Sequence, residues 1–458
     1  MRRGILLQIA GLLAEAAAQA GPVPAQGLHA LAVKAGLQFF GTATDTNNFN
    51  DTAYMDVVNN KNEFGILTPE NSQKWEPTEP RQGAFVFTNP DQVRSLAVKN
   101  TQQFRCHTLT WFEQLPQFVQ TTQWTRETLT AAIRAHITNV VTHYRGQCYS
   151  WDVVNEAIND NGTFRESVFF RTLGTDYIPI SFDAAARADP QAKLYYNDFS
   201  LEFNSNKTDT AVRIVKLVQD AKLRIDGVGF QAHMVVGQTP PRATLVQALS
   251  RFTALGLEVA LTELDVRQPE LPASSRALEQ QSADYASMVA ACLNVAKCVG
   301  VVVWQFTDKY SWVPSTFPGT GEACLFDQNF VKRPAYTAVA KVLSDAASVG
   351  RARVVAPNGP GLPAGGGAGG GALGGGVAAG GGNSKAPFGT GNSTEIGNGI
   401  AGGRARPSQG ATGTGAQPGA PRPTSSGRPV TSGGSTSGGT MVTRLIVLSF
   451  ALSCIVVV

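Results

Sequence analysis

The chain has 458 residues, of which 43% are hydrophobic and 16% are charged, a length that suits one large domain with additional segments. Residues 351–440 contain 29 Gly and 9 Pro, so the globular part must precede them. The net charge is +4, but the ends outside residues 21–350 carry +8, which leaves about −4 for the globular part. This composition excludes a small disulfide-stapled domain and a multi-span membrane protein, and a mildly acidic domain disfavours nucleic-acid binding.

The first twenty residues have the pattern of a secretory signal peptide. A basic start and an apolar run lead to Ala18-Gln19-Ala20, which has the small-x-small form of a cleavage site. Pro22 and Pro24 follow at once and disfavour the alternative, an apolar first helix of the fold. We therefore expect residues 1–20 to be removed and the protein to be secreted.

The C-terminal residues have the pattern of a glycolipid-anchor signal. The largely apolar run 445–458 is shorter than the about 20 residues of a membrane helix, and no basic residues follow it. Small residues precede it, so we expect the anchor to be attached within residues 433–437. Residues 441–458 would then be removed, and residues 351–440 would form a disordered stalk rich in Gly, Pro, Ser and Thr. The alternative is a loosely held membrane-spanning tail.

Glycosylation triplets agree with a secretory route, since Asn-x-Thr or Asn-x-Ser is the acceptor sequence for N-linked glycans. The predicted acceptors are Asn50, Asn161, Asn206 and Asn392.

Six cysteines are present, and an oxidising compartment would allow them to pair. Cys292 and Cys298 are close in sequence, and we predict that they clip a short loop. Cys106 and Cys148 are the next candidates, but the strands predicted below would set them far apart, which disfavours that bond. Cys324 is expected to be the odd one. No Cys-x-x-Cys or His-x-x-x-His spacing indicates a metal site, and we expect no cofactor.

From residue 28 to residue 348, short β-rich apolar runs alternate with longer segments of helical period. Eight such units predict a (β/α)8 barrel, that is, a parallel α/β fold, and the absence of Gly-x-Gly-x-x-Gly disfavours a dinucleotide domain. The predicted strands are Leu37–Gly41, Phe64–Thr68, Phe104–Leu109, Tyr149–Asn155, Leu194–Asn197, Val228–Gln231, Val259–Leu264 and Gly300–Phe306. The predicted helices include Leu129–His143, Thr208–Ala221, Arg242–Leu255, Leu278–Leu293 and a closing helix over Tyr336–Leu343.

Seven of the predicted strands end in residues too polar for a core. A parallel barrel builds its active site at the carboxyl ends of its strands, so these side chains should face one mouth. Helix capping is the alternative, and it is adequate for Asn197 and Asp198 but strained for all seven ends together. The groups are Glu70-Asn71, His107, Asn155-Glu156, Asn197-Asp198, Gln231-Ala232-His233, Glu263-Leu264-Asp265 and Trp304.

Glu156 and Glu263 are candidate catalytic carboxylates. Cleavage of a glycosidic bond needs one protonated carboxyl for the leaving oxygen and one ionised carboxylate for the sugar carbon. His233, with Asp265 behind it, could hold Glu263 ionised, which favours Glu263 as the nucleophile. Asn155 could donate to a sugar 2-hydroxyl. Flat aromatic rings also bind sugars, and four tryptophans lie near strand ends, at positions 75, 111, 304 and 312.

These motifs, in this order and spacing, resemble glycoside hydrolase family 10, the endo-β-1,4-xylanases. The resemblance covers residues 28–345, and its motifs are Glu70-Asn71-Ser72-Gln73-Lys74-Trp75, His107-Thr108-Leu109-Thr110-Trp111, Trp151 to Ala157, Tyr195 to Asp198, Gly229 to His233, Thr262 to Asp265, and Trp304 to Trp312. The sequence departs from the usual family pattern at Phe112-Glu113, where His-Ser is common, and at Gln305-Phe306, where Gly and a small apolar residue are common.

The resemblance implies a (β/α)8 barrel that hydrolyses xylan with retention, Glu156 as acid/base and Glu263 as nucleophile. It also implies that the sugar at the cleaved bond meets Lys74, His107, Asn155, Gln231, His233 and Trp304, while Glu70 and Asn71 meet the next sugar; Trp111 and Trp312 complete the predicted substrate-binding set. The loop clip Cys292–Cys298 fits fungal members. We expect a monomer anchored at the cell surface. Two alternatives are a β-glucan-acting hydrolase or transglycosylase and a wall-anchored carbohydrate-binding protein.

Overall fold

The computed structural model describes residues 26–350, so the predictions for the signal peptide, the stalk, the anchor signal and Asn392 lie outside the described residues, as does the sixth cysteine, Cys454. Eight parallel strands follow one another in the order β6-β5-β4-β3-β2-β1-β9-β8, and pairing of β6 with β8 closes the ring. A ninth short strand, β7, pairs with β8 alone. The strands are β1 Phe39–Thr44, β2 Ile66–Pro69, β3 Gln103–Cys106, β4 Ser150–Asn155, β5 Lys193–Asp198, β6 Gly227–Phe230, β7 His233–Val235, β8 Glu258–Arg267 and β9 Cys298–Val303.

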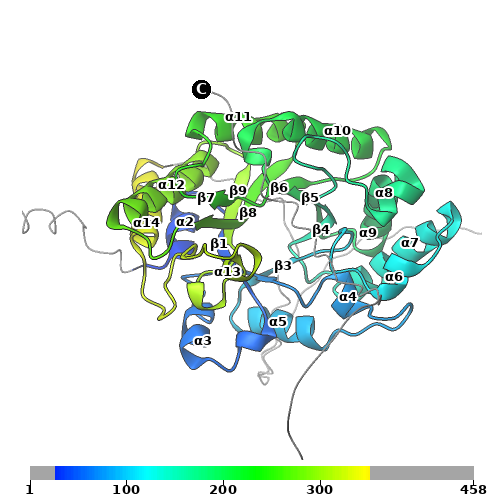
Figure 1. Cartoon of the computed structure of the whole chain (residues 1–458), viewed down its shortest axis with the longest axis horizontal. Coiled ribbons are helices and arrows are strands. Elements are labelled where there is room, and N and C mark those ends of the chain that lie inside the picture. The colour runs from blue at the N-terminus through cyan, green and yellow to red at the C-terminus, as the bar shows by residue number, and fades with distance from the viewer. Residues whose placement is uncertain (1–25, 351–458) are drawn as a thin grey trace, which may run out of the picture. The chain divides into compact units, whose positions relative to one another are not determined.

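Helices surround the ring of strands, and the prediction of a (β/α)8 barrel is confirmed (Figure 1). Four short 3₁₀ turns also occur in the described residues, at Thr46–Asn48, Gly174–Asp176, Leu201–Phe203 and Asp308–Tyr310. The α-helices are α2 Leu28–Lys34, α3 Thr52–Val58, α4 Trp75–Thr78, α5 Thr88–Lys99, α6 Gln117–Thr121, α7 Arg126–His143, α8 Val168–Leu173, α9 Tyr177–Ala188, α10 Asn206–Asp220, α11 Arg242–Thr253, α12 Ser275–Leu293, α13 Val313–Thr316 and α14 Pro334–Val349.

The apolar pattern explains why these segments take these places. Strand β9 reads Cys-Val-Gly-Val-Val-Val and is buried at every position, as a parallel strand covered on both faces must be. Helix α12 buries Tyr285, Met288, Val289 and Cys292, which recur at the three- and four-residue spacing of one helical face. Each helix can therefore lay one apolar stripe against the ring and leave its other face in water.

All eight predicted strands are present, and their bounds shift by only a few residues. Strand β7 is not among the predicted elements, because three residues are too short to display an alternating pattern. Helices α5 and α9 are likewise absent from the prediction. Within residues 26–350, no helix combines the length and the hydropathy that crossing a bilayer requires.

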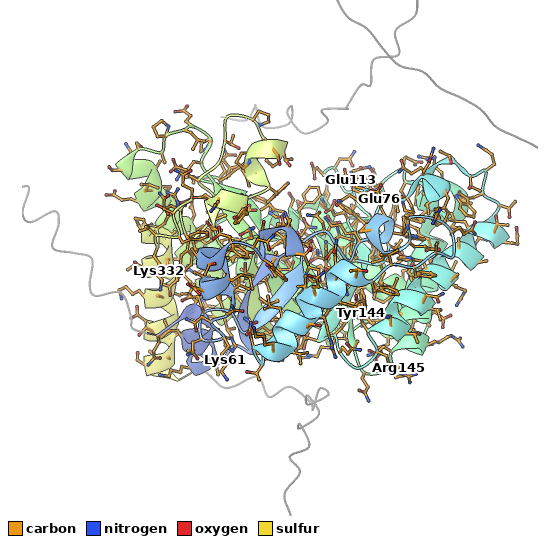
Figure 2. All side chains as sticks on the ribbon, turned by 90° about the horizontal axis from the view of Figure 1, so that it is seen from below. Lys61, Glu76, Glu113, Tyr144, Arg145 and Lys332 are labelled. Atoms are coloured by element: carbon orange, nitrogen blue, oxygen red, sulfur yellow. A yellow bond between two sulfur atoms is a disulfide. The ribbon has the colours of Figure 1, made fainter. Side chains whose placement is uncertain are left out.

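The two ends of the barrel differ in the residues that they carry. Figure 2 shows Glu76 and Glu113 at one end of the molecule and Lys61 and Arg145 at the opposite end. Glu76 and Glu113 follow β2 and β3 along the chain, whereas Lys61 and Arg145 precede β2 and β4. The end that carries Glu76 and Glu113 is therefore the carboxyl end of the strands, where a parallel barrel places its site.

Two disulfides join four of the cysteines in the described residues. Cys292 and Cys298 are bonded, as predicted, and Cys324 is free and buried. Cys106 and Cys148 are also bonded, with their Cα atoms 5.7 Å apart, so the expectation that this pair lies far apart was wrong. The reason is the βαβ connection, which returns the chain to the neighbouring strand. The N–H of Tyr149 donates to the carbonyl of Phe104, so the two cysteines lie side by side.

Candidate active site

Glu263 lies on β8 inside the mouth of the barrel and is 4% exposed. His233 Nε2–H donates to Glu263 Oε2 at 3.2 Å, and Asn197 Nδ2–H donates to Glu263 Oε1 at 2.7 Å. His233 Nδ1–H donates in turn to Asp265 Oδ2 at 2.9 Å, which also accepts from Trp312 Nε1 at 2.8 Å. Both ring nitrogens of His233 therefore act as donors, which is the arrangement of an imidazolium.

The charges around Glu263 keep it ionised. Burial by itself raises the pKa of this carboxyl, but the hydrogen bond from His233 and the charges of His107, His233 and Arg105 outweigh it and lower the pKa to about 2. Burial lowers the pKa of His233, but Asp265 and Glu263 overcome this and raise it to about 10. The His233–Glu263 pair is thus charged on both sides across the neutral pH range.

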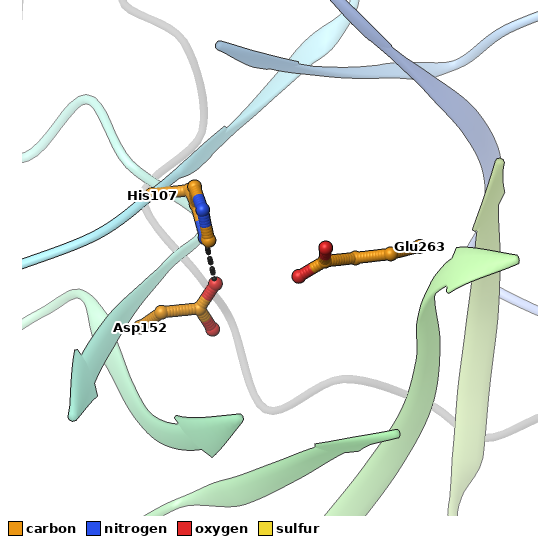
Figure 3. Close-up of side chains that lie close together, drawn as sticks. All are labelled: His107, Asp152 and Glu263. Carbon is orange, nitrogen blue, oxygen red and sulfur yellow. Dashed lines mark hydrogen bonds and ion pairs between the residues drawn. The ribbon is translucent and has the colours of Figure 1, made fainter. Parts of the chain in front are cut away.

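A second buried ion pair lies opposite Glu263. Arg105 Nη2–H donates to Asp152 Oδ1 at 2.6 Å, and His107 Nδ1–H donates to Asp152 Oδ2 at 2.8 Å. Figure 3 shows the Glu263 carboxylate directed toward His107 and Asp152. Arg105 and Asp152 are not in the predicted site, although a charged pair on two strongly apolar barrel strands is a signal that could have indicated them.

One ligand atom each from His107, Asp152 and Glu263 lies within 4.8 Å of the other two, a spacing that could suit a metal ion. Both oxygens of Asp152 and both oxygens of Glu263 already accept hydrogen bonds from protein donors. A cation there would also meet the guanidinium of Arg105. This donor set fits a metal poorly and is better described as the electrostatic surroundings of Glu263.

Glu156 follows β4 and is half-buried, with a backbone φ of +53°. That left-handed conformation is unfavourable for a residue with a side chain and is found where a structure imposes it. Glu156 Oε1 accepts from Asn155 Nδ2 at 3.1 Å and from Gln231 Nε2 at 2.9 Å. Glu263 also accepts from a carboxamide, that of Asn197, but it accepts from the charged His233 as well, whereas both donors to Glu156 are neutral.

Two asparagines connect the carboxylates. Asn197 Nδ2 donates both to Asn155 Oδ1, at 2.8 Å, and to Glu263 Oε1, while Asn155 donates to Glu156. Thr262 Oγ1 donates to Asn197 Oδ1 at 2.7 Å and fixes the orientation of its amide. Asn197 therefore belongs to the site. The sequence analysis placed it among the polar strand ends expected to face the mouth, with helix capping left open as an alternative, and did not include it in the predicted site.

Irregular strand pairing lies just before Glu156 and around Glu263. The register of β4 against β5 shifts between Asp152 and Val154, and the register of β8 against β9 shifts between Leu261 and Leu264. Such bulges redirect side chains next to active sites. Simple alternation along either strand therefore could not have predicted where Glu156 and Glu263 point.

Lys74, predicted for the sugar at the cleaved bond, lies beyond β2 together with Glu70 and Asn71, which were predicted for the next sugar. Lys74 Nζ donates to Asn71 Oδ1 at 2.9 Å and to Gln114 Oε1 at 2.6 Å. Burial lowers the pKa of Lys74 and raises that of Glu70 to about 7, although Lys74 opposes the rise. Gln114 was missed by the sequence analysis, even though it stands in the segment after Trp111 that departs from the usual family pattern.

Three of the four noted tryptophans line this end of the barrel. Trp304 is 5% exposed, with its ring 5.2 Å from that of His107, and Trp312 packs against His233 with ring centres 4.7 Å apart. Trp111 is partly exposed, and Lys74 Nζ lies 4.7 Å from its ring centre. Trp75 differs, since its buried ring stacks on His136 at 3.9 Å, so its expected role as a sugar platform was wrong.

A closed parallel barrel with two carboxylates at its strand ends, one held by cations and one by carboxamides, defines a barrel hydrolase of the glycosidase class. The comparisons with known proteins agree with this class. A family profile described as "Glycosyl hydrolase family 10" matches residues 27–342. The chain belongs to that family.

Curated and solved relatives support the same assignment. The "Endo-1,4-beta-xylanase 5" of Pyricularia oryzae is 58% identical over 365 residues, which cover 78% of this chain and 90% of the relative. The "Endo-1,4-beta-xylanase 1" of Humicola insolens is 54% identical over 339 residues, or 74% of this chain and 79% of the relative. The solved structure of Penicillium canescens endo-1,4-beta-xylanase XylE has 41% identity and a TM-score of 0.68, and the match covers 70% of this chain and 98% of that one.

Proposed function

We propose that this protein is an endo-1,4-β-xylanase that hydrolyses internal β-1,4-xylosidic bonds of xylan with retention of configuration. The observation that carries the proposal is the difference between the two carboxylates. Glu263 is held ionised by His233, while Glu156 is held by neutral amides. The names of the relatives supply the substrate, because each of those quoted above is described as an endo-1,4-beta-xylanase.

In this reaction Glu263 is the nucleophile and Glu156 the acid/base. Glu263 attacks the anomeric carbon while Glu156 gives its proton to the departing glycosidic oxygen, and a glycosyl ester forms on Glu263. Glu156 then takes a proton from water, which attacks the same carbon and releases Glu263. His233 keeps Glu263 unprotonated for the first step, and Asn155 binds the 2-hydroxyl of the sugar at the cleaved bond.

The remaining predicted residues bind the sugar chain on either side of the cleaved bond. Trp304 and His107 form the wall next to Glu263, and their ring centres are 5.2 Å apart. The ammonium of Lys74 gives donors for the sugar at the cleaved bond, and the carboxamides of Asn71 and Gln114 give donors and acceptors for the hydroxyls of the next sugar. The protein acts as a monomer and needs no metal or other cofactor.

The test is product analysis with the purified protein on insoluble arabinoxylan and on mixed-linkage β-glucan. Short xylo-oligosaccharides from arabinoxylan, with the β-anomer formed first, are the expected result. Products from β-glucan alone would support the alternative of a glucan-acting enzyme. Binding without products, from a correctly folded protein, would support the alternative of a carbohydrate-binding protein.

We also propose that the protein is secreted and held at the cell surface by a glycolipid anchor. The support is in the sequence, namely the predicted signal peptide in residues 1–20 and the small residues ahead of the apolar run in 441–458. A phospholipase specific for phosphatidylinositol should release the enzyme from membranes, and activity that stays membrane-bound after this treatment would contradict the anchor.

N-linked glycans on the catalytic domain would accompany the secretory route. Asn50, Asn161 and Asn206 are all exposed, so each side chain is accessible to a glycan. Treatment with an endoglycosidase should lower the apparent mass, and replacing each Asn by Gln identifies the occupied sites. An unchanged mass would contradict the assignment.

A further inference from the structure

The backbone that carries Glu156 is held by an arginine that has no part in the reaction as described so far. Arg165 Nε–H donates to the carbonyl oxygen of Glu156 at 3.1 Å, and Nη2–H donates to the carbonyl of Ile158 at 3.2 Å. The backbone N–H of Arg165 also donates to the carbonyl of Ala157 at 2.8 Å. Three consecutive contacts from one residue thus fix the segment that follows Glu156.

This support acts where the backbone needs it. The left-handed φ of Glu156 persists only if the surrounding structure over-determines it. From the other side, Glu156 N–H donates to the carbonyl of Asn197 at 2.9 Å, and Ala157 N–H donates to the hydroxyl of Tyr196 at 3.2 Å. Arg165 donates to the carbonyl oxygen of the same residue. Its loss would leave Glu156 held through the backbone N–H groups of Glu156 and Ala157 but no longer through its carbonyl.

The guanidinium is itself held by an aromatic ring. The central carbon of Arg165 lies 4.0 Å from the ring centre of Phe112, and Phe112 packs edge-on against Trp111 with centres 5.9 Å apart. Both Phe112 and Arg165 line the small cavity that also contacts Glu156. A flat ring fixes the plane of a guanidinium, and that plane sets the direction of both donors toward the backbone. Phe112 is also one of the positions where the sequence departs from the usual family pattern.

We propose that Arg165, oriented by Phe112, is a positioning residue for Glu156, and that it aligns the acid with the departing glycosidic oxygen. This inference rests on the proposed function. Arg165 meets the backbone of Glu156 and leaves the carboxyl group to Asn155 and Gln231, so its effect falls on the geometry of proton transfer. Glu263 has no contact with this pair and should be unaffected.

A positioning role and a general structural role differ in their dependence on the leaving group. Aryl β-xylobiosides release phenols of different acidity, and dinitrophenolate departs without a proton, whereas unsubstituted phenol and sugar alcohols need one. Misplacing the acid therefore lowers kcat/KM for poor leaving groups and spares it for dinitrophenolate. General damage to the fold lowers kcat/KM equally for substrates with good and with poor leaving groups.

The test compares Arg165→Met with Arg165→Lys on the phenyl and 2,4-dinitrophenyl β-xylobiosides. We expect Arg165→Met to lower kcat/KM for the phenyl substrate by about 10- to 100-fold, a part of the 10²–10⁴-fold that general acid catalysis supplies, and for the dinitrophenyl substrate by less than about 3-fold. Arg165→Lys keeps the charge but lacks the planar guanidinium, and its kcat/KM for the phenyl substrate should lie between those of the wild type and Arg165→Met. Equal losses on both substrates, or no loss on the phenyl substrate, would overturn the proposal.

Arg224→Met is the matched control. Arg224 also donates to two backbone carbonyls, those of Ala192 and Asp189, at 2.7 and 2.9 Å, and it makes no contact with either catalytic carboxylate. Arg224→Met should change kcat/KM for the phenyl and the dinitrophenyl substrates by the same factor. If it loses activity on the phenyl substrate and keeps it on the dinitrophenyl substrate, as expected for Arg165→Met, the effect is not specific to Glu156 and the proposal fails.

Phe112→Leu gives a second test that leaves Arg165 in place and covers the case that Arg165→Met does not fold. Removing the ring should lower phenyl kcat/KM by about 3- to 10-fold with the same leaving-group dependence, and Phe112→Tyr should cost less. A leaving-group-independent change would contradict the proposal. The proposed function is tested separately, because wild-type turnover of xylan does not depend on the outcome for these variants.

Discussion

The two halves of the active site hold the same type of side chain in opposite ways. Burial raises the pKa of Glu263, which lies on β8, but His233 from β7 and the His107 and Arg105 charges from the β3 segment opposite lower it to about 2. The β4 half meets Glu156 with the neutral amides of Asn155 and Gln231. Glu263 is thus kept charged, whereas the hydrogen bonds to Glu156 come from neutral donors.

The comparison extends to the scaffold beneath each half. The β3–β4 region has the Cys106–Cys148 disulfide, and the α12–β9 region next to β8 has the Cys292–Cys298 disulfide. The first closes a loop of 42 residues and the second a loop of 6 residues.

Glu263 and Glu156 are the same residue type, so their proposed roles depend on their different environments. Variants that remove either carboxylate or its neighbours are the direct tests.

The largest effect is expected from removing the nucleophile. Glu263→Ala should lower turnover of every substrate by at least about 10⁴-fold, the scale seen when a covalent nucleophile is lost, while the protein still folds. Steady-state rates measure the loss of turnover, and circular dichroism measures whether the variant is folded. A variant with near-normal turnover would contradict the role of Glu263.

Glu156→Ala should have a selective effect. The loss for xylo-oligosaccharides is expected to be about 10²–10⁴-fold, whereas kcat/KM for a dinitrophenyl β-xylobioside should change little because that leaving group needs no acid. The measurement is kcat/KM across a series of aryl β-xylobiosides. An equal loss for all leaving groups would mean that the two halves do not divide the reaction as described.

The two disulfides should differ in their contribution to the free energy of unfolding. Loop-closure entropy gives about 4 kcal/mol for the 42-residue loop and about 2 kcal/mol for the 6-residue loop. Cys106→Ala/Cys148→Ala should therefore destabilise more than Cys292→Ala/Cys298→Ala in urea unfolding monitored by fluorescence. The reverse order would indicate that local packing outweighs chain entropy in this barrel.

The smallest expected effect is a shift in the pH profile of His233→Asn. Activity requires ionised Glu263 and is lost as the pH falls through the pKa of this carboxyl, which is about 2 in the wild type. Asn can donate a hydrogen bond but carries no charge, so the pKa of Glu263 rises in the variant. The acid limb of the kcat/KM profile should therefore move up by about 1–2 pH units. His143→Asn, which changes a surface histidine paired with Asp91, is the control. An unshifted acid limb would contradict the role of His233.

The same ion pair predicts how stability depends on pH. The pKa of His233 is raised to about 10, so its contribution to the free energy of unfolding is complete below about pH 6.5 and is lost as the pH rises through about 10. The urea midpoint of the wild type should fall over this window by more than that of His233→Asn. Equal pH dependence of the two proteins would contradict a charged pair.

Much of the fold was predictable because its signals are local. Eight apolar runs separated by helical periods indicate a parallel α/β fold, and eight units favour a closed barrel over an open doubly wound sheet. Glu156, Glu263 and His233 were also predictable, because polar residues at the ends of apolar strands have few structural explanations. The Cys292–Cys298 disulfide could be predicted from the short sequence separation of the two cysteines alone.

Other features were decided by tertiary contacts. Cys106 and Cys148 meet because neighbouring barrel strands return to the same level, and Trp75 turns inward because His136, from α7, offers it a stacking partner. Asn197 joins the two carboxylates only because β5 lies between β4 and β6.

The sequence by itself determined which residue types stand at the strand ends, and hence the class of chemistry. The sequence also predicted that His233 holds Glu263 ionised, but only the tertiary structure showed the second group of charges, Arg105 and His107, and the backbone held by Arg165. The physical reason is that pKa values and side-chain directions depend on neighbours within a few ångströms, and here those neighbours come from strands and loops far apart in the chain.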